Sequence, residues 1–200
     1  MIISLKRKFA FLCMPKCAST STEKALRRLA DIRIGGLPSM KHLNYRGYEK
    51  YVVPLIEEAG VERDEMKVYC MVRDPVSWLK SWWRFRQRDA LKDPSHKRHQ
   101  NYTAHLTFEE FFEMWETDLE RPANVGTQRR FLMDNEGNVP DINIYRYEDI
   151  GSLIAAMESD AGRKLEMGSL NQSPSKEAGQ LEIDLNRPRI KSEYDLYNSI

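Results

Sequence analysis

The sequence predicts a single α/β domain, residues 1–200, with a mostly parallel central sheet. Short apolar segments typical of buried strands alternate along the chain with longer amphipathic segments typical of helices. A length of 200 residues and a mass of 23.5 kDa suit one such domain. A hydrophobic content of 41% and a charged content of 30% exclude collagen-like, disordered and disulfide-scaffold proteins.

Three segments have the composition of sheet strands. Residues 9–14 are a short, continuous apolar run, as expected for a strand that is covered on both faces, and residues 67–72 are a second strand segment of buried type. Residues 142–147 alternate apolar and polar side chains and form the third expected strand. A helical pattern follows each of the three, so we expect parallel strands joined by crossover connections.

Capping signals place the starts of several helices. Thr20 with Glu23, and Thr107 with Glu110, match the S/T-x-x-E capping box, and Asp74-Pro75 matches an N-cap followed by proline at the first helical position. One helix is expected to open at Thr107 with four large aromatic residues on its apolar side. The other helices are expected over 22–30, 48–59, 75–90, 150–161 and 191–198.

Charge and cysteine content limit the possible partners. Thirty-one Lys and Arg oppose 30 Asp and Glu, so no global positive field favours nucleic-acid binding, and any bound anion must be held locally. Cys13, Cys17 and Cys70 form no CxxC pair and lack nearby histidines, which favours reduced thiols and argues against a metal site.

The early apolar run does not indicate a targeting segment. Residues 9–14 are too few to span a membrane, and Pro15-Lys16 follows where a cleavage site would need small residues. We therefore expect no membrane span and a cytoplasmic location.

The loop after the first strand is the first candidate anion site. Unpaired backbone N–H groups converge at a helix N-terminus, where the helix dipole adds about half a positive charge. The loop contains no glycine and so is not a Walker A loop. A serine- and threonine-rich helix cap with a solvated lysine is the alternative. The polar side chains that the loop offers are Lys16, Ser19, Thr20, Ser21 and Thr22.

A second candidate anion site follows the strand at 67–72. Arg73 ends this strand, and Ser81 lies eight residues later in the next helix. A guanidinium group there can bind a phosphate through two parallel hydrogen bonds, with the Ser81 hydroxyl as a third donor. Parallel sheets bind nucleotides at the carboxyl ends of their strands, which favours one site with two anion-binding parts. Pairing of Arg73 with Asp74 or another acid is the alternative.

These motifs resemble those of a known enzyme family. Residues 15–21, PKCASTS, look like the 5′-phosphosulfate loop of sulfotransferases that use 3′-phosphoadenosine 5′-phosphosulfate (PAPS). Residues 72–81, VRDPVSWLKS, are similar to the family's 3′-phosphate motif, and 144–150, IYRYEDI, resemble a later motif of carbohydrate sulfotransferases and their bacterial relatives. A weaker similarity covers 171–173. The resemblance implies a P-loop-like, three-layer α/β fold with a central, mostly parallel sheet.

Two positions depart from the family pattern. Cys17-Ala18 stands where glycine or threonine is frequent, and Trp78 stands five residues after Arg73, where a second arginine is common. The first departure bears on how closely the backbone approaches the phosphosulfate. The second removes one possible contact to the nucleotide or substrate.

The resemblance also implies roles for individual residues. Lys16 would act in catalysis on the transferred group, and Lys41-His42 occupies the place where relatives carry a Lys-His pair near the acceptor, which makes His42 the candidate base. A surface or capping role for His42 is the alternative, and Glu49 is the next acid or base nearby. The residues expected to bind the nucleotide are Lys16, Cys17, Ala18, Ser19, Thr20, Ser21, Arg73 and Ser81.

The implied reaction is sulfuryl transfer from PAPS to a hydroxyl or amine of a carbohydrate or small metabolite, releasing 3′,5′-adenosine bisphosphate without a metal. A nucleotide kinase-like phosphotransferase and a non-catalytic nucleotide-binding protein are the alternatives.

The basic segment 73–99 is either a rim that attracts an anionic ligand or a solvated helix face that pairs with the acidic segment 106–121. The sequence specifies neither the acceptor nor the oligomeric state.

Other side chains have weaker claims to function. Among Trp78, Trp82 and Trp83, the spacing predicts that some lie in the core, and one of them stacking on adenine or a sugar is the alternative. Three histidines, His96, His99 and His105, are expected to be solvated, with a substrate lid as the alternative. Cys17 is expected to be a loop residue rather than a nucleophile.

Overall fold

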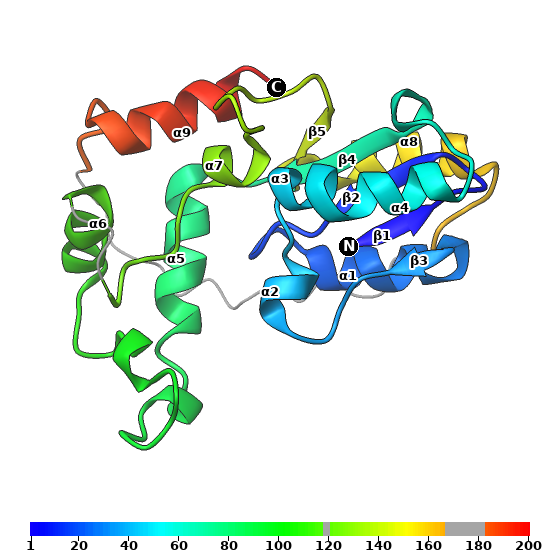
Figure 1. The fold of residues 1–200 in the computed structure, drawn as a ribbon. Coiled ribbons are helices and arrows are strands. Elements are labelled where there is room, and N and C mark those ends of the chain that lie inside the picture. Colours follow the sequence, from blue (N-terminus) through cyan, green and yellow to red (C-terminus); the bar gives the residue numbers. More distant parts are fainter. Residues whose placement is uncertain (118–120, 167–182) are drawn as a thin grey trace. The chain divides into compact units, whose positions relative to one another are not determined.

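The computed structural model describes residues 1–117, 121–166 and 183–200, and the weak family similarity at 171–173 lies outside them. The described chain forms two compact units (Figure 1). The first contains the described residues of 1–73 and 128–172 together with Ile200, and the second contains those of 74–127 and 173–199.

An open five-stranded sheet forms the centre of the first unit, with the strand order β3–β1–β2–β4–β5 among the described residues. β2 (Phe9–Leu12) pairs in parallel with β4 (Lys67–Val72), which pairs in parallel with β5 (Asn143–Arg146). β1 (Ile2–Ser4) pairs antiparallel with β2 and with β3 (Ile32–Arg33). The sheet is therefore mixed, with a parallel part and an antiparallel part.

The parallel part consists of the three strands that the sequence predicts, which confirms the α/β class. All of β2 is buried, and β4 is buried from Val68 to Val72, which explains why the buried residues of both strands form continuous apolar runs. The antiparallel part is a correction to the expected, mostly parallel sheet. Its strands β1 and β3 have 3 and 2 residues, too few to show a period in the sequence.

Helices cover both faces of this sheet. Figure 1 shows α4 (Val53–Glu58) over one face and α8 (Ile150–Ala161) over the other. A π-helical stretch, Tyr48–Val52, joins α3 to α4, so the helix expected over 48–59 consists of this stretch followed by α4. The other helices of the first unit are α1 (Ser19–Leu26), α2 (Pro38–Lys41), α3 (Tyr45–Gly47) and α7 (Gln128–Leu132), and its 3-10 turns are Arg27–Leu29, Arg63–Glu65 and Tyr147–Asp149.

The described part of the second unit is helical. α5 (Pro75–Phe85), α6 (Phe108–Thr117) and α9 (Pro188–Asn198) pack against one another. Their apolar sides bury Trp78, Leu79, Phe111, Trp115 and Ile190. Two 3-10 turns, Asp89–Leu91 and His99–Asn101, lie between α5 and α6 in the sequence. Each helix among the described residues is too short or too polar to cross a bilayer.

Two predicted helix starts are confirmed in this unit. The Asp74 carboxylate accepts a hydrogen bond of 2.7 Å from the Ser77 amide, and Pro75 lies in the first turn of α5. Thr107 and Glu110 form the reciprocal capping box, with bonds of 2.7 and 3.2 Å.

The end of α5 differs from the prediction, since the helix stops at Phe85 rather than near residue 90. The Thr103 hydroxyl donates to the Trp83 carbonyl over 2.8 Å, and the Thr103 amide donates to the Arg86 carbonyl over 3.3 Å. This returning segment thus satisfies carbonyl groups that a longer helix would have used internally.

Candidate nucleotide-binding site

The loop between β2 and α1 has an unusual backbone. Lys16 and Ala18 both adopt left-handed conformations, with φ values of 67° and 48°. This region disfavours residues with a Cβ, and glycine is its usual occupant. Left-handed residues in tight loops turn successive N–H groups toward one side, which creates a concave site for anions. The glycine-free loop therefore reaches a strongly curved conformation through two strained residues.

The N-terminus of α1 leaves several backbone donors unsatisfied. α1 begins at Ser19, and no side chain caps it. The amides of Ser21 and Thr22 donate to the Ala18 carbonyl over 2.9 and 3.2 Å. The preceding amides, of residues 17–20, find no acceptor among the described residues. This row of donors at the positive end of a helix suits an anionic group.

The capping box predicted from Thr20 and Glu23 is wrong. The helix starts two residues earlier than such a cap requires, with Ala18 rather than Thr20 at the N-cap, and both side chains instead contact Lys41. The Lys41 ammonium donates to the Thr20 hydroxyl over 2.8 Å and lies 3.2 Å from a Glu23 carboxylate oxygen. Thr20 is thus exposed at the helix start and holds the segment that carries His42.

The structure brings His42 to the same loop. Its Nδ1 lies 2.6 Å from the Cys13 carbonyl oxygen, directly before the loop, while its neighbour Lys41 contacts Thr20 directly after the loop. A carbonyl oxygen only accepts hydrogen bonds, so Nδ1 carries the proton and Nε2 keeps its lone pair. Burial lowers the pKa of His42 below the ordinary 6.5, an effect that the charge on Lys41 reinforces and the hydrogen bond to Cys13 opposes. The imidazole is therefore neutral at pH 7, as a general base must be.

Gln128, at the first position of α7, ties the loop to the end of β4. Its side-chain oxygen accepts a hydrogen bond of 2.8 Å from the Arg73 amide, and its side-chain nitrogen donates to the Arg73 carbonyl over 2.8 Å. The Cys17 thiol lies 3.6 Å from the same oxygen. The Gln128 side chain is buried, so these bonds form away from water and fix the backbone at Arg73 firmly.

Arg73 itself lies over an aromatic ring at the end of β5. Its guanidinium carbon is 4.7 Å from the centre of the Tyr147 ring, a distance typical of cation–π contacts. β2, β4 and β5 are parallel, so the loop at 13–18, Arg73 and Tyr147 all follow carboxyl ends of strands at the same edge of the sheet. This edge therefore combines backbone donors with a positioned guanidinium group.

Cys17 faces the interior rather than the loop opening. Burial raises the pKa of its thiol well above the ordinary value, so the group stays protonated. All three cysteines are free and buried. Nucleophilic chemistry at Cys17 has no support, and what this residue offers to a ligand is its backbone amide.

Ser81 lies on α5 and belongs to the second unit, whereas Lys16, His42 and Arg73 belong to the first. The structure therefore brings together the loop, His42 and Arg73, and the participation of Ser81 stays a prediction from the sequence.

Other side chains with predicted roles have structural functions within the second unit. Trp78 is buried and packs edge-on against Trp82, with ring centres 6.2 Å apart. The Trp83 indole donates to the Leu106 carbonyl over 3.1 Å. His99 lies 3.0 Å from the Leu91 carbonyl, while His96 and His105 are exposed. These contacts are those expected for a helical core and its surface.

Three charged side chains of the basic segment 73–99 and the acidic segment 106–121 bind partners within the second unit. The Arg86 guanidinium donates to the carbonyls of Pro122 and Asn124, and burial lowers its pKa to about 10. Glu113 pairs with Arg187, and Glu116 caps the start of α9.

Gln128 and Tyr147 are residues that sequence reasoning assigns no role. Gln128 follows a segment without a strand or helix pattern, and a buried glutamine leaves no periodic signal. Tyr147 lies inside the motif at 144–150, and this position is the clue that the sequence offers.

Comparison of the chain with family models, with curated proteins and with solved structures finds no match.

Proposed function

We propose that the protein transfers a sulfuryl group from PAPS to a hydroxyl or amine of an acceptor, of which a carbohydrate or small metabolite is the favoured class. The proposal includes a P-loop-like, three-layer fold and a cytoplasmic enzyme that needs no metal for this reaction. One observation carries it. The amides of residues 17–20, at the start of α1, find no acceptor among the described residues, and Gln128 links this loop, through the Cys17 thiol, to Arg73 at the same edge of the sheet.

PAPS carries negative charge at both ends of its adenosine, so its recognition needs two separate anion-binding groups. In the proposal, the amides of residues 17–20 and the hydroxyls of Ser19, Thr20 and Ser21 bind the 5′-phosphosulfate. Arg73 binds the 3′-phosphate with the help of Ser81. ATP lacks a 3′-phosphate and would leave Arg73 without an anion, which disfavours the kinase alternative.

The proposed chemical step is an in-line displacement at sulfur. The acceptor oxygen forms a bond to sulfur while the bond between sulfur and the bridging phosphate oxygen breaks. The bonding electrons stay on the phosphate, so 3′,5′-adenosine bisphosphate leaves with an additional negative charge. Lys16 would stabilise that charge as it develops, and a positioned cation of this kind contributes about 10²–10³ in rate.

His42 would take the proton that the acceptor loses. The Cys13 carbonyl fixes its tautomer with the proton on Nδ1, so Nε2 is the atom that accepts. A lowered pKa keeps this nitrogen unprotonated at neutral pH. Proton transfer by such a base contributes about 10²–10⁴ in rate.

Sulfate transfer to a panel of hydroxyl and amine acceptors tests the proposal, with release of 3′,5′-adenosine bisphosphate as a second readout. Once an acceptor is found, Lys16→Gln and His42→Gln are expected to lower kcat by about 10²-fold or more. Lys50→Gln and His96→Gln, at exposed positions of the same residue types, are the controls and should retain activity. Unchanged transfer in both catalytic variants would refute the assignments, and magnesium-dependent ATP turnover without sulfate transfer would favour the kinase alternative.

A further inference from the structure

A hollow in the first unit is lined by basic side chains from α1, from the turn after it and from the segment that follows α8. It has a volume of about 200 Å³ and lies between α1 and the segment that follows α8. Lys24 and Arg28 come from α1 and the turn after it, and Arg163 and Lys164 follow α8. Glu166 is the one acid among the residues that line it.

The positive charge of this hollow is largely uncompensated. Lys164 pairs with Glu158 at 2.9 Å, but Lys24, Arg28 and Arg163 form no ion pair within the part of the chain that the structure describes. Lys24 lies near the end of α1 and Arg28 in the 3-10 turn directly after it, so these two like charges line the same hollow. Repulsion between these cations would be relieved by an anion in the hollow.

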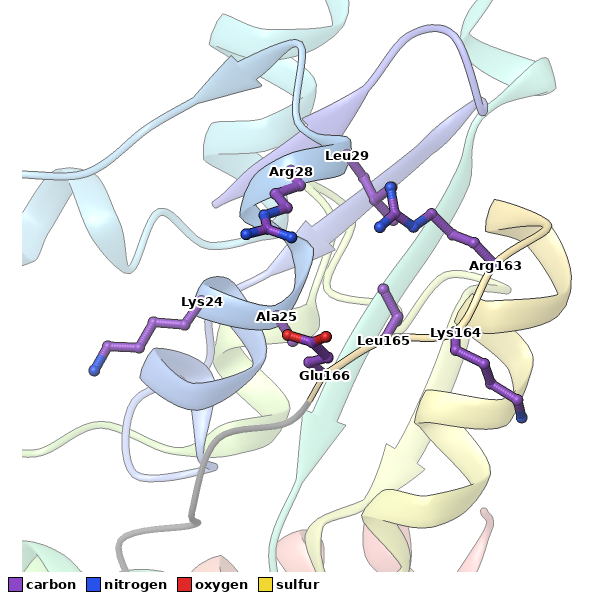
Figure 2. Close-up of a pocket in the computed structure, with 8 residues that line it drawn as sticks. All are labelled: Lys24, Ala25, Arg28, Leu29, Arg163, Lys164, Leu165 and Glu166. Atoms are coloured by element: carbon purple, nitrogen blue, oxygen red, sulfur yellow. The ribbon is translucent and has the colours of Figure 1, made fainter.

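The two arginines have the placement of a binding pair. Figure 2 shows their guanidinium groups on either side of the hollow, while the ammonium groups of Lys24 and Lys164 point outward at its rim. The position of Arg163 is fixed by the end of α8. Gly162 has a φ of 63°, and the Arg163 amide donates back to the Glu158 carbonyl over 3.3 Å, as in a Schellman cap.

The hollow is separate from the candidate nucleotide site. That site uses the N-terminal end of α1, whereas Arg28 lies about two and a half helical turns further along, roughly 13 Å. Basic residues near the C-terminal ends of α1 and α8 also complement the helix dipoles. Dipole compensation does not require the guanidinium groups to flank one hollow.

We infer that Arg28 and Arg163 bind the phosphate or sulfate monoester of a small ligand in this hollow. Planar guanidinium groups form paired hydrogen bonds with tetrahedral oxyanions, and two of them from different elements can contact different oxygens. A volume of about 200 Å³ accommodates one charged group with part of the molecule that carries it, not a whole nucleotide. The inference does not depend on the proposed function.

Calorimetric titration at low ionic strength tests the site with inorganic phosphate, glucose 6-phosphate and glucosamine 6-sulfate. Phosphatidylcholine vesicles with and without phosphatidic acid distinguish a lipid headgroup from a soluble ester. Arg28→Gln and Arg163→Gln are each expected to weaken binding about 10-fold or more, as for loss of a charge-assisted contact. Glu166→Gln is expected to tighten binding about 2- to 5-fold because it removes the opposing charge.

Two further variants make the result specific. Arg27→Gln removes the neighbouring exposed cation, which does not line the hollow, and should change affinity less than 2-fold if a built site rather than diffuse charge is responsible. Lys16→Gln should leave this binding intact. Equal losses in Arg27→Gln and Arg28→Gln, loss only in Lys16→Gln, or absence of binding to every probe would each overturn the inference.

Discussion

Replacement of Gln128 by methionine tests whether this buried side chain fixes the end of β4. Methionine has nearly the same volume, so little cavity forms and the change mainly removes hydrogen bonds. Two bonds of 2.8 Å to the Arg73 backbone are lost. With about 1–1.5 kcal/mol for each bond left unmade, Gln128→Met should lower the free energy of unfolding by about 2–3 kcal/mol. For a chain of this length that corresponds to a melting temperature roughly 4–12 °C lower.

Far-UV circular dichroism is the appropriate probe, because all four tryptophans lie in the second unit and report on its environment. Gln100→Met, at an exposed position, is the matched control and should stay within about 0.5 kcal/mol of the wild type. Gln128→Met should also bind 3′,5′-adenosine bisphosphate more weakly, since the Arg73 backbone loses its two hydrogen bonds to Gln128. A Gln128→Met protein as stable as the control would refute the claim that Gln128 fixes the end of β4.

Three further predictions concern other parts of the molecule. Ala18→Gly should raise the free energy of unfolding by about 0.5–1 kcal/mol in urea denaturation, because the φ of 48° strains alanine. The control Ala25→Gly, within α1, should lower it by about 1 kcal/mol. Two changes of the same sign would contradict the strain argument. Glu116→Ala should lower the free energy of unfolding by about 2–3 kcal/mol, because the buried carboxylate accepts bonds of 2.7 and 3.0 Å from the Arg189 and Ile190 amides. Glu113→Ala breaks an exposed pair with Arg187 and should lower it by less than about 1 kcal/mol. Similar losses in the two variants would show that the cap at the start of α9 is unimportant. If His42 is the base, kcat should rise with pH through the pKa of His42 in the complex. The rise should be centred below pH 6.5, because burial lowers that pKa and the imidazole loses its proton at lower pH than a free histidine; a rise centred above pH 7 would contradict this.

Much of the fold could be predicted because it depends on local composition. β2 and the part of β4 from Val68 to Val72 are buried and therefore apolar, and the caps at Asp74 and Thr107 depend on groups a few residues away. β1 and β3 carry too few residues for a pattern, and β3 in addition depends on pairing with β1, which is far from it in the sequence. The start of α1 was mispredicted because Thr20 and Glu23 are used by Lys41, which is remote in sequence.

The candidate site could likewise be predicted only where it depends on local sequence. Lys16 and Arg73 could be found because each directly follows a recognisable strand. The link between them could not, because Gln128 lies 55 residues from Arg73 and 111 from Cys17. The approach of His42 to the loop likewise rests on its bond to Cys13, 29 residues away. Such contacts follow from the topology of the sheet, so no spacing of residues in the sequence indicates them.

The most direct test of the central claim compares the affinities of 3′,5′-adenosine bisphosphate and adenosine 5′-monophosphate in the wild type and in Arg73→Gln. Calorimetry should show that the wild type prefers the bisphosphate by about 10-fold or more, and that Arg73→Gln loses most of this preference while its affinity for the monophosphate changes little. A wild type that binds both nucleotides equally, or a preference that survives in Arg73→Gln, would contradict the assignment of the 3′-phosphate to Arg73.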